Sequence, residues 1–315
     1  MMLLKELIRT GIETISEAYP EREAREMVYA FLEHHIGTKR HTHIVDPGYE
    51  VSDAAVAGAM AAFERMAAGE PLQYVTGFAD FYGRQFRVTP DVLIPRPETE
   101  LLCRIALELG TGCQECGNDI FAPPGRGRRP TEHLAASDGI RILDMCTGSG
   151  CIAWTLALEI PGAEVTAVDI SDGALEVASS QDFAEEMART GAHAPTFIKA
   201  DVLCHPERHQ KYDIIVSNPP YVMDKEKTLM RRNVLEHEPH LALFVSDDDP
   251  LIFYRAVARW SAALLKPEGY GLVEINEALG LQTAAVFREA GFSHAEILQD
   301  LSGRDRFVLF HSRSF

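Results

Sequence analysis

The stretch Ser217-Asn218-Pro219-Pro220-Tyr221 carries the most distinctive chemistry in the chain. The apolar run before it predicts a buried strand. A residue before proline is pushed toward an extended backbone, and the two prolines fix φ and remove two backbone donors. The sequence therefore predicts a stiff turn that offers a side-chain amide, free carbonyls and an aromatic ring, which together suit a planar group bearing an NH2.

An amide nitrogen is a poor nucleophile, because its lone pair is delocalised into the carbonyl. If the Asn218 side-chain oxygen and the Pro219 carbonyl each accept one N–H, the nitrogen is held in line with an incoming methyl group. The same acceptors favour the positive charge that develops on the nitrogen, so no strong base is required. With Tyr221 packed against the amide plane, this turn indicates a methyltransferase that acts on a planar NH2.

A glycine-rich loop lies between a predicted strand and a predicted helix, in the order Cys146-Thr147-Gly148-Ser149-Gly150. Glycine lets the backbone approach a ligand closely, and a helix N-terminus favours electron-rich groups. Asp169 ends the next predicted strand, where an acid can accept hydrogen bonds from a ribose diol. Because Gly148-x-Gly150-x-x-Ala153 also fits the dinucleotide fingerprint, the loop alone leaves a nicotinamide and an adenosyl cofactor open.

Asp201 follows the third predicted strand of the same sheet. An acid there can accept from an adenine amino group. Solvated aspartates are nearly as common after strands, so the pattern leaves both interpretations open.

Strands and helices alternate from residue 140 onward, which predicts an α/β, Rossmann-like, mostly parallel sheet. Residues 295–299 and 306–311 are expected to form a final strand pair, with the last strand antiparallel. One helix is expected from Ser171 to Thr190. The expected domains are a helical domain (1–75), a β-hairpin linker (76–90) and a methyltransferase domain (91–315) that contains a mobile insertion (110–138).

Composition narrows the function classes. The 315-residue chain has 46% hydrophobic and 24% charged residues, a soluble globular profile, and its net charge of -17 argues against non-specific nucleic-acid binding. The N-terminus lacks signal-peptide features, no apolar run is long enough to span a bilayer, and the six cysteines are sparse, so we expect a cytoplasmic protein. We expect no metal site, because neither the histidine group nor the cysteine pair completes a ligand set: His34, His35, His41 and His43; Cys113 and Cys116.

Over nearly its whole length the chain resembles the protein-(glutamine-N5) methyltransferases that modify peptide chain release factors. Besides the glycine loop, Asp169 and the Asn-Pro-Pro-Tyr turn, the resemblance rests on four runs: Gly69-Glu70-Pro71-Leu72-Gln73-Tyr74-Val75-Thr76-Gly77, Leu93-Ile94-Pro95-Arg96-Pro97-Glu98-Thr99-Glu100, Glu236-His237-Glu238-Pro239-His240-Leu241-Ala242-Leu243 and Gly303-Arg304-Asp305-Arg306. The Ile-Pro-Arg-Pro-Glu-Thr-Glu run combined with Asn-Pro-Pro-Tyr is far more specific than either motif alone.

The resemblance implies S-adenosylmethionine as methyl donor and the glutamine of a Gly-Gly-Gln loop in class 1 release factors as acceptor. It implies that the helical N-terminal domain helps to dock the release factor. It also implies site roles: Cys146, Thr147, Gly148, Ser149 and Gly150 along the cofactor, Asp169 on its ribose, Asp201 and Val202 at its adenine, Asn218 beside the cofactor, and Asn218, Pro219, Pro220 and Tyr221 on the glutamine.

The family usually has glycine where this chain has Cys146. We expect cofactor binding to survive if φ at Cys146 is negative, because the side chain is small. Three other functions compete with methylation of a release factor: methylation of a ribosomal-protein glutamine by a sister enzyme, adenine-N6 methylation of nucleic acid, and a non-catalytic binding module. The nucleic-acid enzyme would need a basic groove and a route for a flipped base, and the complete site motifs count against the binding module.

Overall fold

The computed structural model describes residues 1–111, 139–207 and 210–312. Within these ranges the chain forms two compact units, one of residues 1–78, 88–90 and 229–238, the other of residues 79–87, 91–228 and 239–315. Apart from its first two residues, the insertion expected at 110–138 lies outside the described residues, as do Cys113 and Cys116.

The first unit is mainly helical, as expected for the N-terminal residues. Its core is formed by apolar residues at helical spacing, of which Leu7, Val28 and Phe63 are completely buried. Ser52 caps the fourth helix by accepting a hydrogen bond from Ala55 N at 3.3 Å. The elements of the first unit are β1 (Met2–Leu3), α1 (Leu4–Ile15), α2 (Glu21–Ile36), α3 (Thr42–Val45), β2 (Glu50–Val51), α4 (Asp53–Ala67), α5 (Leu72–Thr76) and α10 (Arg232–His237).

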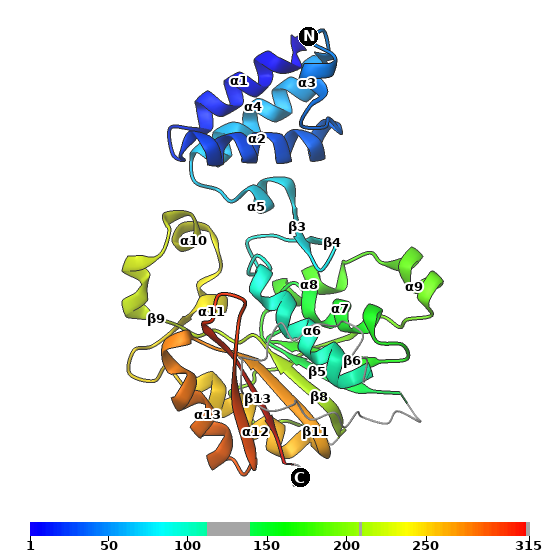
Figure 1. Ribbon diagram of the computed structural model, residues 1–315, viewed down its shortest axis with the longest axis vertical. Helices are drawn as coiled ribbons and strands as arrows, with labels where there is room; N and C mark the ends of the chain where they lie inside the picture. The colour runs from blue at the N-terminus through cyan, green and yellow to red at the C-terminus, as the bar shows by residue number, and fades with distance from the viewer. Residues whose placement is uncertain (112–138, 208–209, 313–315) are drawn as a thin grey trace. The chain divides into compact units, whose positions relative to one another are not determined.

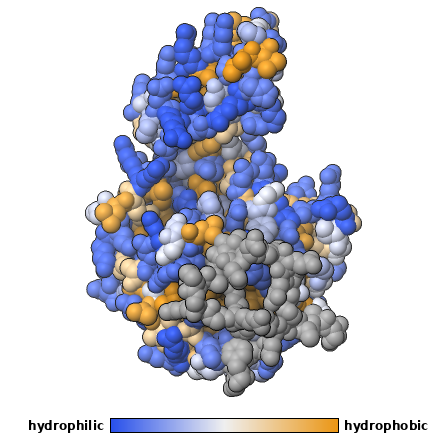
Figure 2. All heavy atoms as spheres, in the orientation of Figure 1, coloured by the Kyte–Doolittle hydropathy of each residue, from blue (hydrophilic) through white to orange (hydrophobic). Residues whose placement is uncertain are grey.

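Helix α10 joins this unit from far along the chain. Arg231, which precedes it, donates to Glu23 of α2 at 2.9 Å. Most of the unit's visible surface is hydrophilic, with apolar surface near α3, where Ile44 and Val45 are exposed (Figure 2). No periodic pattern in the sequence predicts that residues 229–238 belong with the N-terminal helices.

The second unit is built on a seven-stranded sheet with the spatial order β12-β13-β11-β8-β5-β6-β7. Figure 1 labels its five central strands, from β13 to β6. Neighbouring strands run parallel except that β13 is antiparallel to both β11 and β12. The expected Rossmann-like, mostly parallel sheet with an antiparallel last strand is therefore confirmed. The strands are β5 (Arg141–Met145), β6 (Glu164–Asp169), β7 (Thr196–Lys199), β8 (Tyr212–Ser217), β11 (Leu265–Glu274), β12 (His294–Gln299) and β13 (Asp305–His311).

Helices cover both faces of this sheet. On one face, Ile142 of β5 and Ile214 of β8 pack with α6 (Pro97–Thr111) and α7 (Cys151–Glu159). The residues that alternate with them along the same two strands point to the other face and pack with α12 (Ile252–Leu264) and α13 (Gly280–Glu289). None of the described helices combines the length and the apolar character that a membrane crossing requires. The remaining elements are β3 (Phe78–Phe81), β4 (Arg84–Arg87), α8 (Asp172–Ser179), α9 (Ala184–Thr190), β9 (Val222–Met223), η1 (Asp224–Leu229), α11 (His240–Leu243), β10 (Phe244–Val245) and η2 (Glu277–Leu279).

The single helix expected from Ser171 to Thr190 is wrong, because the chain leaves the helix between α8 and α9. Gln181, only 7% exposed, lies in this break. Its side chain accepts from Arg87 N at 2.8 Å and donates to the carbonyls of Arg87 and Ser149 at 3.0 and 3.1 Å. These long-range bonds require the Gln181 amide to point into the protein interior. The chain therefore leaves the helix here, although the local sequence pattern favours a continuous helix.

Candidate active site

The predicted site segments all lie at the carboxyl edge of four adjacent strands. β8 ends directly before Asn218, β5 ends directly before the glycine loop, and β6 ends at Asp169. β7, the outermost strand, ends two residues before Asp201. Because these strands are parallel neighbours, their ends meet at one edge, where open α/β sheets bind ligands.

Backbone hydrogen bonds tie the glycine loop to the end of β6. Gly148 N donates to Asp169 Oδ2 at 2.9 Å, and Ser171 N donates to the other carboxylate oxygen at 3.0 Å. Thr147 N donates to the Val168 carbonyl at 3.1 Å. A carboxylate has about four lone-pair sites, so Asp169 can still accept hydrogen bonds from a ribose diol.

The two glycines of the loop differ in what surrounds them. Both have positive φ, +54° at Gly148 and +79° at Gly150. A Cβ at Gly150 would lie 3.0 Å from Ala178 Cβ, whereas a Cβ at Gly148 would meet nothing within 4 Å. The loop therefore presents bare backbone beside the Asp169 carboxylate, an arrangement that fits the nucleoside of S-adenosylmethionine.

The segment after β7 is held by α12. Asp201 Oδ1 accepts from Leu203 N at 2.8 Å, and the Val202 side chain is buried. Arg259 donates to the Leu203 carbonyl at 2.7 Å, and Trp260 Nε1 donates to the Cys204 carbonyl at 2.8 Å. Asp201 and Val202 are thus placed next to Asp169 along the same edge, because β7 pairs with β6.

The Asn218 side chain has a defined orientation. Its Nδ2 donates to Thr99 Oγ1 at 3.2 Å, and Thr99 Oγ1 donates in turn to Glu274 Oε2 at 2.7 Å. Pro219 and Pro220 are buried, so the turn is fixed on both sides of the amide. Among the described residues none donates to Asn218 Oδ1, which leaves this oxygen as a free acceptor.

Residues at the end of β11 support the turn. Val273 pairs with Ser217, which places Glu274 beside Asn218, and Tyr221 OH donates to Glu274 Oε1 at 2.9 Å. Asn276 Nδ2 then donates to the Tyr221 carbonyl at 3.2 Å.

Sequence reasoning assigned no role to Thr99, Glu274 or Asn276. For Glu274, the available signal was an acidic residue inside the apolar run Gly271-Leu272-Val273-Glu274-Ile275.

Comparison with known proteins places the chain in a family. Residues 6–77 match the PrmC N-terminal domain and residues 131–242 match the methyltransferase small domain. A release factor glutamine methyltransferase of Flavobacterium psychrophilum is 33% identical over 99% of this chain and 100% of its own length. The chain belongs to the release factor glutamine methyltransferase family. A second relative of that name, from Bacteroides thetaiotaomicron, is 40% identical over 78% of this chain and 77% of its own, and a third, from Streptococcus pneumoniae, is 34% identical over 97% and 94%.

One residue of this family member departs from the expected backbone. Cys146 has φ +61°, so the condition of a negative φ is not met. A left-handed conformation costs a non-glycine residue roughly 1–2 kcal/mol. Burial raises the pKa of the Cys146 thiol, which keeps it protonated at neutral pH. The chain therefore holds a strained cysteine in the loop where glycine would be unstrained.

Cys146→Gly should relieve this strain. Glycine loses more backbone entropy on folding, about 0.5–1 kcal/mol, which offsets part of the gain. The matched control is Cys204→Gly at an exposed position outside the left-handed region, where the entropy loss is joined only by the loss of a thiol hydrogen bond to Asp201 Oδ2 at 3.7 Å. In denaturant unfolding, we expect the free energy of unfolding of Cys146→Gly to be about 1 kcal/mol higher than that of Cys204→Gly. The affinity for the cofactor should not fall. Equal destabilisation by the two changes would contradict a strained Cys146.

Two buried carboxyl groups and one partly buried tyrosine border the site. Burial raises the pKa of Asp144 to about 7, although Thr147 Oγ1 donates to its carboxylate at 2.6 Å. Burial also raises the pKa of Glu274, against the hydrogen bonds from Thr99 and Tyr221. Burial and the Glu274 charge raise the pKa of Tyr221 well above its ordinary value, so its hydroxyl stays protonated and donates.

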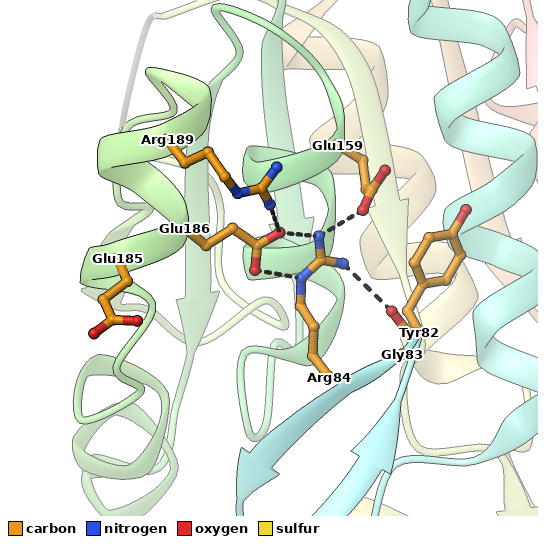
Figure 3. Close-up of a pocket in the computed structure, with 7 residues that line it drawn as sticks. All are labelled: Tyr82, Gly83, Arg84, Glu159, Glu185, Glu186 and Arg189. Atoms are coloured by element: carbon orange, nitrogen blue, oxygen red, sulfur yellow. Dashed lines mark hydrogen bonds and ion pairs between the residues drawn. The ribbon is translucent and has the colours of Figure 1, made fainter.

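A separate hollow of about 520 Å³ lies where the hairpin β3–β4 meets α7 and α9. Figure 3 shows the Arg84 guanidinium between the carboxylates of Glu159 and Glu186. The Arg84 side chain is 11% exposed, and Arg189 adds a second cation to Glu186. These ion pairs join the hairpin to α7 and α9. The described residues include no group of three or more His, Cys, Asp or Glu side chains that could hold a metal ion.

Proposed function

We propose that this chain transfers a methyl group from S-adenosylmethionine to the side-chain amide N5 of the glutamine in the Gly-Gly-Gln motif of class 1 peptide chain release factors. The observation that carries the proposal is the Asn218 amide, turned so that its oxygen is free beside a rigid proline turn. Family membership supports both the donor and the acceptor.

The cofactor would be held by the carboxyl ends of β5, β6 and β7. The loop Cys146–Gly150 offers its backbone, Asp169 accepts from the ribose, and Asp201 and Val202 border the adenine. S-adenosylmethionine supplies a methyl group made electrophilic by its sulfonium.

The substrate glutamine would be held by the Asn-Pro-Pro-Tyr turn. Asn218 Oδ1 and the Pro219 carbonyl each accept one N–H of the amide, which fixes the direction of its nitrogen. Both oxygens stabilise the positive charge that develops on this nitrogen, so the proton can leave later without a strong base. The Tyr221 ring, fixed through its hydroxyl, packs against the amide plane.

A protein substrate is favoured over nucleic acid. The net charge of -17 opposes phosphate binding, which depends on basic residues. Residues 1–75, which carry none of the site residues, would help to dock the release factor, with 76–90 as the linker to the methyltransferase domain 91–315. A cytoplasmic location follows from a substrate that acts in translation.

Incubation with radiolabelled S-adenosylmethionine tests the proposal. The purified chain is offered, separately, a class 1 release factor, the same factor with the Gly-Gly-Gln glutamine changed to asparagine, a ribosomal protein fraction and DNA. We expect label on the unchanged release factor alone. Label on ribosomal protein would support the sister activity, label on DNA would support adenine methylation, and either one without label on the release factor would overturn the proposal.

A further inference from the structure

The hydrogen-bond chain from Asn218 through Thr99 to Glu274 has a direction. An ionised Glu274 carboxylate, 1% exposed, can only accept hydrogen bonds. Thr99 Oγ1 therefore directs its single proton to Glu274 Oε2 at 2.7 Å and must accept from Asn218 Nδ2 at 3.2 Å. Because the two ends of a side-chain amide have opposite hydrogen-bonding character, this chain decides which end of Asn218 faces away from Thr99.

We propose that Glu274 is a positioning residue for methyl transfer: through Thr99 it selects the amide orientation in which Asn218 Oδ1 faces the substrate, and through Tyr221 it fixes the neighbouring ring. The inference rests on the proposed function of the Asn-Pro-Pro-Tyr turn. The two oxygens of one carboxylate thus hold the turn at its first and last residues, since Tyr221 OH donates to Oε1 at 2.9 Å.

The sheet gives this carboxylate a fixed place. Glu274 ends β11, and the parallel pairing of Val273 with Ser217 of β8 sets its register against Asn218. Asn276, two residues on, donates to the Tyr221 carbonyl and to Glu226 at 3.2 and 2.8 Å. The positioning group and the turn it orients are therefore carried by adjacent strands rather than by loops.

Stability alone does not account for a charge at this position. Compared with an apolar residue of similar volume, a buried charged group gives little or no net stability, because its desolvation offsets its attractions. The carboxylate does supply polarity, which no apolar residue can. A glutamine in its place could donate from Nε2 to Thr99, whose hydroxyl would then donate to Asn218 and favour the reversed amide.

The polarity depends on the ionised form of Glu274. Burial raises the pKa of this carboxyl, so lowering the pH protonates it earlier than an exposed glutamate. A protonated Glu274 can donate to Thr99 and lose the direction of the chain, so kcat should fall on the acid side. Its ionisable and charged neighbours are Glu98 and Cys103 of α6, Cys151 of α7, Tyr221 after β8, Tyr254 of α12 and Arg306 of β13.

Glu274→Gln and Thr99→Val test the inference in the full-length chain, with labelled S-adenosylmethionine and a release factor. Each change should lower kcat about tenfold to a hundredfold, because the acceptor atom is misplaced. The KM for release factor and the Kd for S-adenosylmethionine should stay unchanged. Thr99→Ser keeps the hydroxyl and should therefore have the kcat of the wild-type chain, unlike Thr99→Val. In Glu274→Gln, the fall in kcat on the acid side of the wild-type pH profile should be absent.

Two matched controls separate positioning from general damage. Glu268→Gln makes the same change at an exposed position of β11, and Thr283→Val removes a buried hydroxyl that has no hydrogen-bond partner among the described residues. Both should keep wild-type kcat. Wild-type kcat in Thr99→Val, or equal loss in Thr99→Val and Thr99→Ser, would overturn the inference, and these two variants decide it even if Glu274→Gln does not fold. A wild-type chain that leaves release factor unlabelled would instead overturn the proposed function.

Discussion

Asn218→Ala should lower kcat for methyl transfer to release factor by about a hundredfold to a thousandfold, the range found when one preorganised polar group of an active site is removed. Alanine removes the Oδ1 acceptor that holds one N–H of the substrate amide, while the Pro219 carbonyl remains. The glycine loop and Asp169 are tied to β5 and β6, so they do not depend on this side chain. S-adenosylmethionine binding should therefore weaken much less than methyl transfer.

Single-turnover labelling and equilibrium binding of S-adenosylmethionine measure the two quantities separately. Asn233→Ala, the same change at a partly exposed position of α10, is the matched control and should methylate at the wild-type rate. Asn218→Asp adds a second test, because it removes the Nδ2 donor and places a carboxylate near the buried Glu274. It should also be slow, although an acceptor oxygen is still present. Near wild-type methylation by Asn218→Ala would mean that the acceptor assignment is wrong.

Local signals were sufficient to locate one half of the site. Glycines with positive φ, prolines after a strand and an aspartate at a strand end each determine the structure of only a few neighbouring residues, so a short stretch of sequence is enough to recognise them. The alternation of strands and helices then implied that the ends of parallel strands share an edge, which brings Asp169 and Asn218 to one side of the sheet. The mostly parallel sheet could therefore be predicted from the sequence.

The other half depends on pairings that leave no local pattern. Thr99 reaches Asn218 across 119 residues and Glu274 across 175. The sequence shows that an acid lies within an apolar strand, but it does not show which strand is the neighbour or in what register. The break after α8 has the same origin, since the bonds of Gln181 span 94 residues to Arg87. Distant partners override local propensity at these positions.

Gly271→Ala should destabilise the second unit by about 3 kcal/mol, at the upper end of what overpacking usually costs. Gly271 of β11 pairs with Phe310 of β13, and a Cβ there would lie 1.9 Å from Phe310 Cζ. The Phe310 ring is fully buried and cannot withdraw, because it stacks on Phe287 with ring centroids 4.0 Å apart and meets Phe292 at 4.7 Å.

The same strand links this packing to the site. Gly271 lies three residues before Glu274, so a shift of β11 away from Phe310 would also move the carboxylate that holds Thr99 and Tyr221. We therefore expect the folded fraction of Gly271→Ala to show a reduced kcat as well as a lower unfolding midpoint.

Denaturant unfolding of single and double variants tests this packing argument. Gly48→Ala is the control, because its added Cβ would meet only Asp46 Oδ1 at 3.6 Å in ordinary contact. Phe310→Leu should be destabilising by itself, since it removes a buried ring. Combined with Gly271→Ala it should make room for the new methyl group, so the double variant should be more stable than the sum of the two single effects predicts. Strict additivity would show that the Phe310 ring is not what opposes the new methyl group. A Gly271→Ala variant as stable as Gly48→Ala would show that β11 and β13 can separate without loss and that the Phe310 ring does not fix the position of Glu274.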